Sequence, residues 1–377
     1  MRRGLHATPS TGRRLASVDC LRGLAVAGMI LANNPGDRDH VYALLRHAAW
    51  DGCTLADLVF PLFLFLVGVS VALAVDGKRV RAGQGPRFWT RVLRRACVLF
   101  LLGLAENAWL RLSLAELRLP GVLQRIAVVY LVAVWLHVRL RSNRGLALTV
   151  AATLLGYWLV LALVPVPGLG QPSLDKAVNL EGWLDQLVLG NHIWKAGTTW
   201  DPEGLLSTLP AAALGLIGVL AGRRLRAGGL GPAAGIALGL AMIGLGLAWG
   251  LVFPLNKSLC TSSFVLFTGG LGLTLLAVAH GLLDDASPRP WSAPLRALGQ
   301  NALTVYVAAS LGASILRQAT VLGASGARVS AQQRLFQALF GGWPDPFLAS
   351  LAWGVLFLAL AWLVAWALAK RGLVIRA

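Results

Sequence analysis

Long apolar segments recur along almost the whole chain, and they constrain its fold more than any other feature. A helix needs about 20 predominantly apolar residues to cross the hydrocarbon core of a bilayer. We expect such spans at 15–33, 57–75, 92–110, 121–138, 146–164, 206–222, 231–252, 262–283, 298–316 and 347–369. Because a backbone in lipid has to satisfy its hydrogen bonds within the segment, the sequence predicts an all-α polytopic membrane protein of about ten transmembrane helices.

The charged residues agree with this class of fold. They make up 13% of the chain, whereas a soluble domain carries roughly 25%. A net charge of +18 would suggest nucleic-acid binding in a soluble protein. Here the segments on the side of the N-terminus hold about twice as many Lys and Arg residues as those on the other side. This bias follows the positive-inside rule, so we expect both termini in the cytoplasm and no nucleic-acid partner.

We expect one transmembrane domain over residues 1–377, with 1–14 as a cytoplasmic tail. The first apolar run contains Asp19 and Arg22 and lacks a small-residue cleavage site, so we interpret it as a retained helix and not a signal peptide. The two charged residues stand three positions apart and therefore share a helix face. Ionisable groups inside a span are costly. Two interpretations stay open: an ion pair that locks the helix, or a contribution to a substrate path.

The four cysteines show no metal-ligand spacing, and we expect no metal. Cys53 and Cys260 both fall near the expected outer face, where an oxidising compartment would permit a disulfide. Free thiols at both positions are the favoured interpretation.

Polar and aromatic residues crowd the segment just before the second apolar run, between Asn33 and Pro61. Thr54 is a good N-cap for the following helix, and Asp57 would lie in its first turn, where the helix dipole favours an anion. Capping does not explain His47. A histidine side chain is suited to act as a general base near neutral pH, or to accept an acyl group as a nucleophile.

The same segment carries a resemblance to a known family. Residues 47–61 read His-Ala-Ala-Trp-Asp-Gly-Cys-Thr-Leu-Ala-Asp-Leu-Val-Phe-Pro, which is similar to the signature of the heparan-α-glucosaminide N-acetyltransferase family and its bacterial relatives among the transmembrane acyltransferases. Further similar motifs follow in chain order: Ser17-Val18-Asp19-Cys20-Leu21-Arg22-Gly23, Asn33-Asn34-Pro35-Gly36, Gly121-Val122-Leu123-Gln124-Arg125, Asp201-Pro202-Glu203-Gly204, Asn256-Lys257-Ser258-Leu259 and Gly299-Gln300-Asn301-Ala302.

The resemblance implies a multi-pass enzyme of the bacterial inner membrane. It would move acetyl from cytosolic acetyl-CoA to the amino group of a glucosamine-type sugar on the periplasmic side. Acetyl-CoA would be a co-substrate, and a homodimer is the expected assembly. His47 matches the catalytic histidine of the family and Asn33 the asparagine that works beside it, although Asn34 is a near neighbour. Direct transfer with His47 as base is favoured over an acyl-imidazole intermediate, and the sequence leaves both open.

Other polar residues in the matched motifs are candidates for the substrate and acetyl-CoA pathway. These are Asn34, Trp50, Asp57, Asp19, Arg22, Gln124, Arg125, Asp201, Glu203, Asn256, Lys257 and Asn301. For Asp201 and Glu203 an N-terminal helix cap is an equal alternative. The candidates to meet the CoA phosphates are Lys78, Arg79, Arg94 and Arg95. For each of these four, a charge that only sets topology is the stronger alternative.

Two other functions compete with N-acetyl transfer. O-Acylation of an envelope glycan would need the same base, and it differs in giving an ester where N-acetylation gives an amide. A small-molecule transporter would suit the number of spans and the charges inside the first one. Binding of CoA would separate a transporter from either enzyme.

Overall fold

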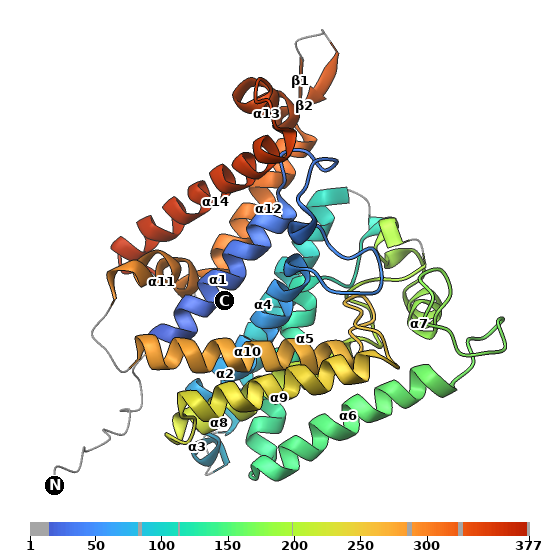
Figure 1. Ribbon diagram of the computed structural model, residues 1–377, viewed down its shortest axis with the longest axis vertical. Helices are drawn as coiled ribbons and strands as arrows, with labels where there is room; N and C mark the ends of the chain where they lie inside the picture. The colour runs from blue at the N-terminus through green and yellow to red at the C-terminus, as the bar shows by residue number, and fades with distance from the viewer. Residues whose placement is uncertain are drawn as a thin grey trace.

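Nearly all regular structure in the computed structural model is helical (Figure 1). The structure describes residues 15–81, 85–111, 114–197, 199–284, 289–322 and 327–374. The expected tail 1–14 lies outside the described residues. The α-helices are α1 (Ala16–Asn33), α2 (Leu55–Ala74), α3 (Gly77–Arg81), α4 (Gly85–Arg111), α5 (Val122–Arg139), α6 (Asn143–Leu163), α7 (Leu180–Leu189), α8 (Thr208–Arg226), α9 (Pro232–Gly250), α10 (Ser262–Leu283), α11 (Ala293–Gln300), α12 (Ala302–Gln318), α13 (Ala331–Phe340) and α14 (Pro346–Lys370).

Eight of the described helices are long and apolar enough to cross a membrane, namely α1, α2, α5, α6, α8, α9, α10 and α14. The all-α polytopic class is therefore confirmed, while the number of spans and their orientation stay predictions. The expected span 92–110 lies within α4, but that helix carries Arg94, Arg95 and Glu106. Because of these charged residues, α4 is not among the eight helices that are apolar enough to cross a membrane.

The expected continuous span 298–316 is wrong in one respect, because the structure breaks it at Asn301. The residue has φ −120° and ψ 31°, which ends α11 and starts the shorter α12. Two long-range contacts lie at this break. The Asn301 side chain donates to the carbonyl of Leu373 (3.1 Å). Gly299 packs so closely on α1 that an added Cβ would lie 1.7 Å from the carbonyl oxygen of Asp19.

Helices α2 and α8 pack closely against each other through small residues. Gly218 of α8 lies against α2, where an added Cβ would stand 2.0 Å from the carbonyl oxygen of Phe65. Lipid chains are as apolar as the helices, so association depends on close packing of small residues. This contact fixes the position of α2, the helix whose first turn carries Asp57.

We expect Gly218→Val to destabilise the protein by about 1–3 kcal/mol, because the new side chain forces α2 and α8 apart. The measurement is the thermal unfolding midpoint in detergent. Gly244→Val is the matched control, since a Cβ at Gly244 of α9 meets nothing within 4 Å. Equal midpoints for the two variants would contradict the packing argument.

Short elements cover the end of the bundle where α1 and α12 finish and α2 and α14 begin. They include a hairpin of β1 (Thr320–Leu322) and β2 (Arg328–Ser330), paired antiparallel with Thr320 opposite Ser330. The hairpin and α13 lie together at the top of Figure 1. With the expected orientation, this is the outer end of the molecule.

Candidate active site

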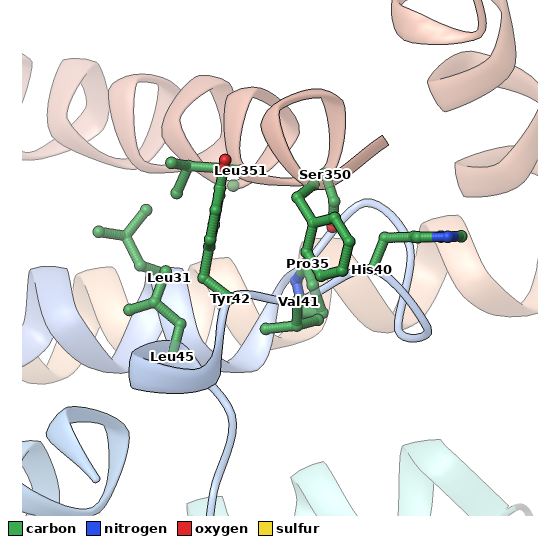
Figure 2. Close-up of a pocket in the computed structure, with 10 residues that line it drawn as sticks. Leu31, Pro35, His40, Val41, Tyr42, Leu45, Ser350 and Leu351 are labelled. Atoms are coloured by element: carbon green, nitrogen blue, oxygen red, sulfur yellow. The ribbon is translucent and has the colours of Figure 1, made fainter. Parts of the chain in front are cut away.

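The loop between α1 and α2 carries His47, and its first half is anchored on α14. The backbone N–H of Gly36 donates to the carbonyl of Ser350 (3.2 Å), and the N–H of Asp37 donates to the Ser350 hydroxyl (3.0 Å). The rings of His40 and Tyr42 both pack on Phe347 of α14. Figure 2 shows Tyr42 extending from the loop toward α14 across the cavity between them. These contacts hold the loop as an ordered part of the fold.

The second half of the loop is held by Asp57, which is 1% exposed in the first turn of α2. Its Oδ2 accepts from three donors of the loop: Ala48 N (3.0 Å), Thr54 N (3.1 Å) and Thr54 Oγ1 (3.0 Å). Thr54 is the N-cap residue of α2, as the sequence predicted. Helix capping and the Ala48 contact therefore use Oδ2 of Asp57, and Oδ1 is available to other partners.

The second oxygen of Asp57 faces His47 and Lys257. His47 Nδ1 lies 2.7 Å from Asp57 Oδ1, and Lys257 Nζ lies 3.3 Å from the same oxygen and 3.1 Å from His47 Nδ1. An unprotonated Nδ1 would point a lone pair at the carboxylate. The consistent arrangement therefore has Nδ1–H donating to Asp57, with the Lys257 ammonium also donating to Asp57. The lone pair of His47 is then on Nε2.

The environment of His47 leaves this nitrogen accessible. The side chain is 44% exposed, and Nε2 forms no hydrogen bond with the part of the chain that the structure describes. A histidine whose inner nitrogen is held by a buried carboxylate and whose outer nitrogen is free is suited to take a proton or to attack an acyl carbon.

Lys257 reaches His47 because two loops are joined across the outer end. Asn256, which is fully buried, donates from Nδ2 to Asp51 Oδ1 (3.0 Å), and the N–H of Gly52 donates to the carbonyl of Leu255 (2.8 Å). Asn256 Oδ1 in turn accepts from the N–H of Leu259 (2.9 Å). Asn256 thus positions the loop, and Lys257 provides the charge.

Trp50 attaches the His47 loop to the segment between α6 and α8. Its Nε1 donates to the carbonyl of Leu174 (2.9 Å), and its ring packs edge-on against Trp200 at 5.0 Å between centroids. Trp200 also packs against Trp194. Trp50 therefore has a structural role beside the site, with its N–H already used.

The two asparagines at the end of α1 differ in their surroundings. The Asn34 side chain is buried, and its Nδ2 donates to the carbonyl of Ile30 (2.9 Å), four residues earlier. Asn33 is exposed and lines a cavity between α1 and α12. No hydrogen bond joins Asn33 to His47 in the described residues. The role of Asn33 beside His47 stays a prediction.

Asp201 and Glu203 form an ion-pair cluster that the sequence did not predict, because the partner is Arg118. Arg118 Nε lies 2.8 Å from Asp201 Oδ2, and Arg118 also bonds Glu203. Burial disfavours the Arg118 cation, but hydrogen bonds and charge from the two carboxylates outweigh this and raise its pKa. The helix-cap alternative is wrong, since α8 begins at Thr208 with Ser207 as its N-cap.

A second buried cluster adjoins this one through the hydrogen bond from the N–H of Asp201 to Asp185 (3.3 Å), and it contains Arg125 and two acids that the sequence analysis missed. Arg125 donates to the carbonyl of Gly204 (3.1 Å). Asp185 accepts from the N–H of Leu205 (2.9 Å). Burial and the neighbouring Asp185 raise the pKa of Glu181 to about 8. The amphipathic pattern of α7 gave no sign that these acids face inward, because their hydrogen-bond partners lie 16 or more residues away along the chain.

The remaining pathway candidates lie away from His47. Asp19 and Arg22 form an ion pair (2.6 Å), and Arg22 also donates to the carbonyl of Gly299 (3.3 Å). Asp19 precedes Asn33 by 14 residues, which is about 21 Å along a helix. This geometry supports the locking interpretation. Gln124 is buried where α5 meets α4, with its Oε1 beside Gly103.

Of the four CoA phosphate candidates, three have described side chains. Lys78 and Arg94 are exposed, and the Arg95 guanidinium lies 4.9 Å from the centre of the Tyr130 ring. The Arg79 side chain lies outside what the structure describes. These residues are on α3 and the first half of α4, beyond the end of α2 that is opposite to His47.

Cys53 and Cys260 are both free thiols, as the favoured interpretation expected. Burial and the nearby Asp57 carboxylate raise the pKa of Cys53 to about 12, so the thiol stays protonated at neutral pH. Among the described residues, no group of His, Cys, Asp and Glu side chains has the arrangement of a metal site.

Together these features define a polytopic membrane protein with a carboxylate-backed histidine at the outer end of its second helix. The chain belongs to the heparan-alpha-glucosaminide N-acetyltransferase family, whose catalytic-region profile matches residues 14–177. It is 30% identical to heparan-alpha-glucosaminide N-acetyltransferase of Homo sapiens over 352 residues, covering 78% of this chain and 52% of the human protein.

The protein of the same name from Mus musculus is 31% identical over 261 residues, covering 57% of this chain and 39% of the mouse protein. The chain thus spans about half the length, or less, of the curated relatives it matches. The matched region 14–177 contains Asn33, His47 and Asp57.

Proposed function

We propose that this protein is a membrane acetyltransferase that moves acetyl from cytosolic acetyl-CoA to the amino group of a glucosamine-type sugar on the periplasmic side. The observation that carries the proposal is the His47–Asp57 pair, with Nδ1 bound to the carboxylate and Nε2 free. The names of the relatives supply the reaction class. The bacterial inner membrane and a homodimer belong to the same proposal.

In the favoured route, the neutral sugar amine attacks the thioester carbonyl while His47 Nε2 takes a proton from the nitrogen. The C–N bond forms, the C–S bond breaks, and the imidazolium returns the proton to the CoA thiolate. The products are an acetamide and free CoA. Asp57 stabilises the imidazolium while it exists and holds the ring in the reactive tautomer.

Asn33 is the proposed hydrogen-bond donor to the negative charge that develops on the carbonyl oxygen of the thioester. In the alternative route, Nε2 itself attacks the thioester, forms an acyl-imidazole and then passes the acetyl to the amine. Both routes need the lone pair on Nε2. Label retained on the protein before any acceptor is added would identify the second route.

The first test uses the full chain in lipid nanodiscs with radiolabelled acetyl-CoA. We expect label to move to glucosamine as an amide that resists hydroxylamine, and no label to move to N-acetylglucosamine, whose nitrogen is blocked. A hydroxylamine-sensitive ester on both sugars would instead establish O-acylation. Folded protein that neither binds nor consumes acetyl-CoA would refute the enzyme proposal and leave a transporter as the function to pursue.

Lys257 should influence the reactivity of His47, because its ammonium lies 3.1 Å from Nδ1 and opposes a second positive charge there. In Lys257→Met this opposing charge is lost, so the acid limb of the pH–rate profile should move to higher pH and the rate below neutral pH should fall.

The control for this prediction is Lys257→Arg, which keeps the positive charge and should keep the wild-type pH profile. The measurement is kcat/KM from pH 5 to 9. Asp57, which accepts from Nδ1, and Lys257, whose ammonium lies 3.1 Å from the same nitrogen, are the charged groups that face His47 in the described residues. A lower rate with an unmoved profile would give Lys257 a merely structural role.

A further inference from the structure

Two buried carboxyl groups of α7 lie close together, and the proposed mechanism uses neither of them. Glu181 is 1% exposed, and Asp185 is fully buried one turn later. Both pack on Gly204, where an added Cβ would lie 2.8 Å from Glu181 Oε1 and 2.2 Å from Asp185 Oδ2. Because both distances start from the same point, these two oxygens are at most 5.0 Å apart. Two anions this close repel each other strongly away from water, so one carboxyl keeps a proton.

The hydrogen bonds assign this proton to Glu181. Asp185 accepts from two backbone groups, the N–H of Leu205 (2.9 Å) on Oδ1 and the N–H of Asp201 (3.3 Å) on Oδ2. Such donors favour a charged carboxylate. Glu181 Oε1 has no partner in hydrogen-bond geometry within the described chain, although Ser207 lies nearby. Burial raises the pKa of Asp185 only to about 6, whereas that of Glu181 rises to about 8.

Arg125 supplies one positive charge against these two acids. Its Nη2 donates to the carbonyl of the glycine on which both carboxyl groups pack (3.1 Å). One guanidinium balances one carboxylate, so this group of charges is neutral when Asp185 is ionised and Glu181 is not. Among the described residues, Tyr157 and Cys260 are the other titratable side chains beside Glu181. Both are neutral at pH 7.

A neutral Glu181 fixes the direction of the Tyr157 hydroxyl on α6. This hydroxyl lies 2.5 Å from the carbonyl oxygen of Leu259 and 3.4 Å from Glu181 Oε2. A tyrosine has one hydroxyl hydrogen, and the shorter contact takes it. The lone pair of Tyr157 then faces Glu181, which can donate to it only while protonated. An ionised Glu181 would instead draw the tyrosine hydrogen away from Leu259.

The Leu259 carbonyl belongs to the turn that places Lys257 beside His47. The peptide group between Leu259 and Cys260 is held at both ends, because its N–H donates to the carbonyl of Lys257 (3.1 Å). Cys260 has φ 48°, and no other non-glycine residue in the described chain has a positive φ. Such a conformation persists only where its surroundings hold it. A Tyr157 hydroxyl that turns away therefore removes a support from this turn.

We propose that Glu181 is a positioning residue for acetyl transfer, acting as a neutral carboxylic acid. It directs the Tyr157 hydroxyl onto the carbonyl of Leu259. The turn supported in this way keeps Lys257 beside His47. The inference rests on the proposed function for the role of His47, but the protonation of Glu181 does not depend on that function. Ionisation of Glu181 should lower the rate of transfer on the alkaline side of the pH–rate profile.

The first test asks whether Glu181 is protonated in the full chain in lipid nanodiscs. The infrared difference spectrum between the wild type and Glu181→Gln at pH 6 should contain the carbonyl stretch of a protonated carboxylic acid. This band should be absent from the same difference at pH 10. Glu116→Gln is the matched control, because Glu116 is exposed and pairs with Lys195, and it should remove no such band. Glu181→Met replaces the amide variant if that variant does not fold.

The second test compares kcat/KM of Glu181→Gln with that of the wild type from pH 6 to 10. The amide stays neutral and can donate to Tyr157, so the variant should lack the alkaline loss. The ratio of variant to wild type should rise about tenfold between pH 7 and pH 9, because a group with a pKa of about 8 ionises over that interval. The ratio cancels the titration of the acceptor amine, and for Glu116→Gln it should stay constant.

A third measurement reads the turn without any reaction. Amide hydrogen exchange of residues 256–261 should be equal in the wild type and Glu181→Gln at pH 6 and faster in the wild type at pH 9. A wild type that lacks the acid band at pH 6 overturns the inference, and so does a ratio of kcat/KM that is constant with pH. If no sugar is acetylated, the proposed function fails separately, and equal exchange at pH 9 then refutes the support of the turn by Glu181.

Discussion

Replacing His47 with alanine is expected to reduce the rate of acetyl transfer by about 100- to 10,000-fold, to near the background rate. This is the range that a positioned general base contributes, and the acyl-imidazole route would lose its nucleophile entirely. The side chain is 44% exposed, and among the described residues its ring hydrogen-bonds Asp57 and lies beside Lys257, so its removal leaves the packed core untouched. Single-turnover transfer of labelled acetyl is the measurement.

Two controls make this result interpretable. His192→Ala removes another histidine of the outer side, whose ring bonds the carbonyl of Leu117, and should retain activity within a few-fold. Thermal unfolding and acetyl-CoA binding of His47→Ala should match the wild type. Transfer at more than a tenth of the wild-type rate would remove His47 from the mechanism in either route.

Asp57→Asn is expected to reduce transfer by about 100- to 10,000-fold while the fold is retained. The amide oxygen can keep the three hydrogen bonds that Asp57 Oδ2 accepts from Ala48 and Thr54. The amide nitrogen then faces His47 Nδ1 as a donor. The imidazole must accept there, which moves its proton to Nε2 and removes the reactive lone pair.

The readout that distinguishes this tautomer effect from loss of structure is the stability of the variant. Asp57→Asn should keep its unfolding midpoint within a few degrees, whereas Asp57→Ala should lower it, since three buried donors lose their acceptor. A fully active Asp57→Asn enzyme would mean that the carboxylate serves only to cap α2.

The sequence determined those features that depend on one segment at a time. Apolar run length predicts most of the helices, since every residue facing lipid must be apolar and every backbone group must bond within its helix. Thr54 and Asp57 could be placed at the start of α2 because capping acts within one turn. His47 was identified by its motif, and Asp57 belongs to the same motif, ten residues further along the chain.

Only the tertiary structure decided the contacts between distant segments. Lys257 meets His47 across 210 residues, Arg118 meets Asp201 across 83, and Asn301 breaks an apolar run by bonding Leu373 across 72. No local pattern encodes such pairs, because a charge in a membrane protein is stabilised by whichever group the packed helices bring to it.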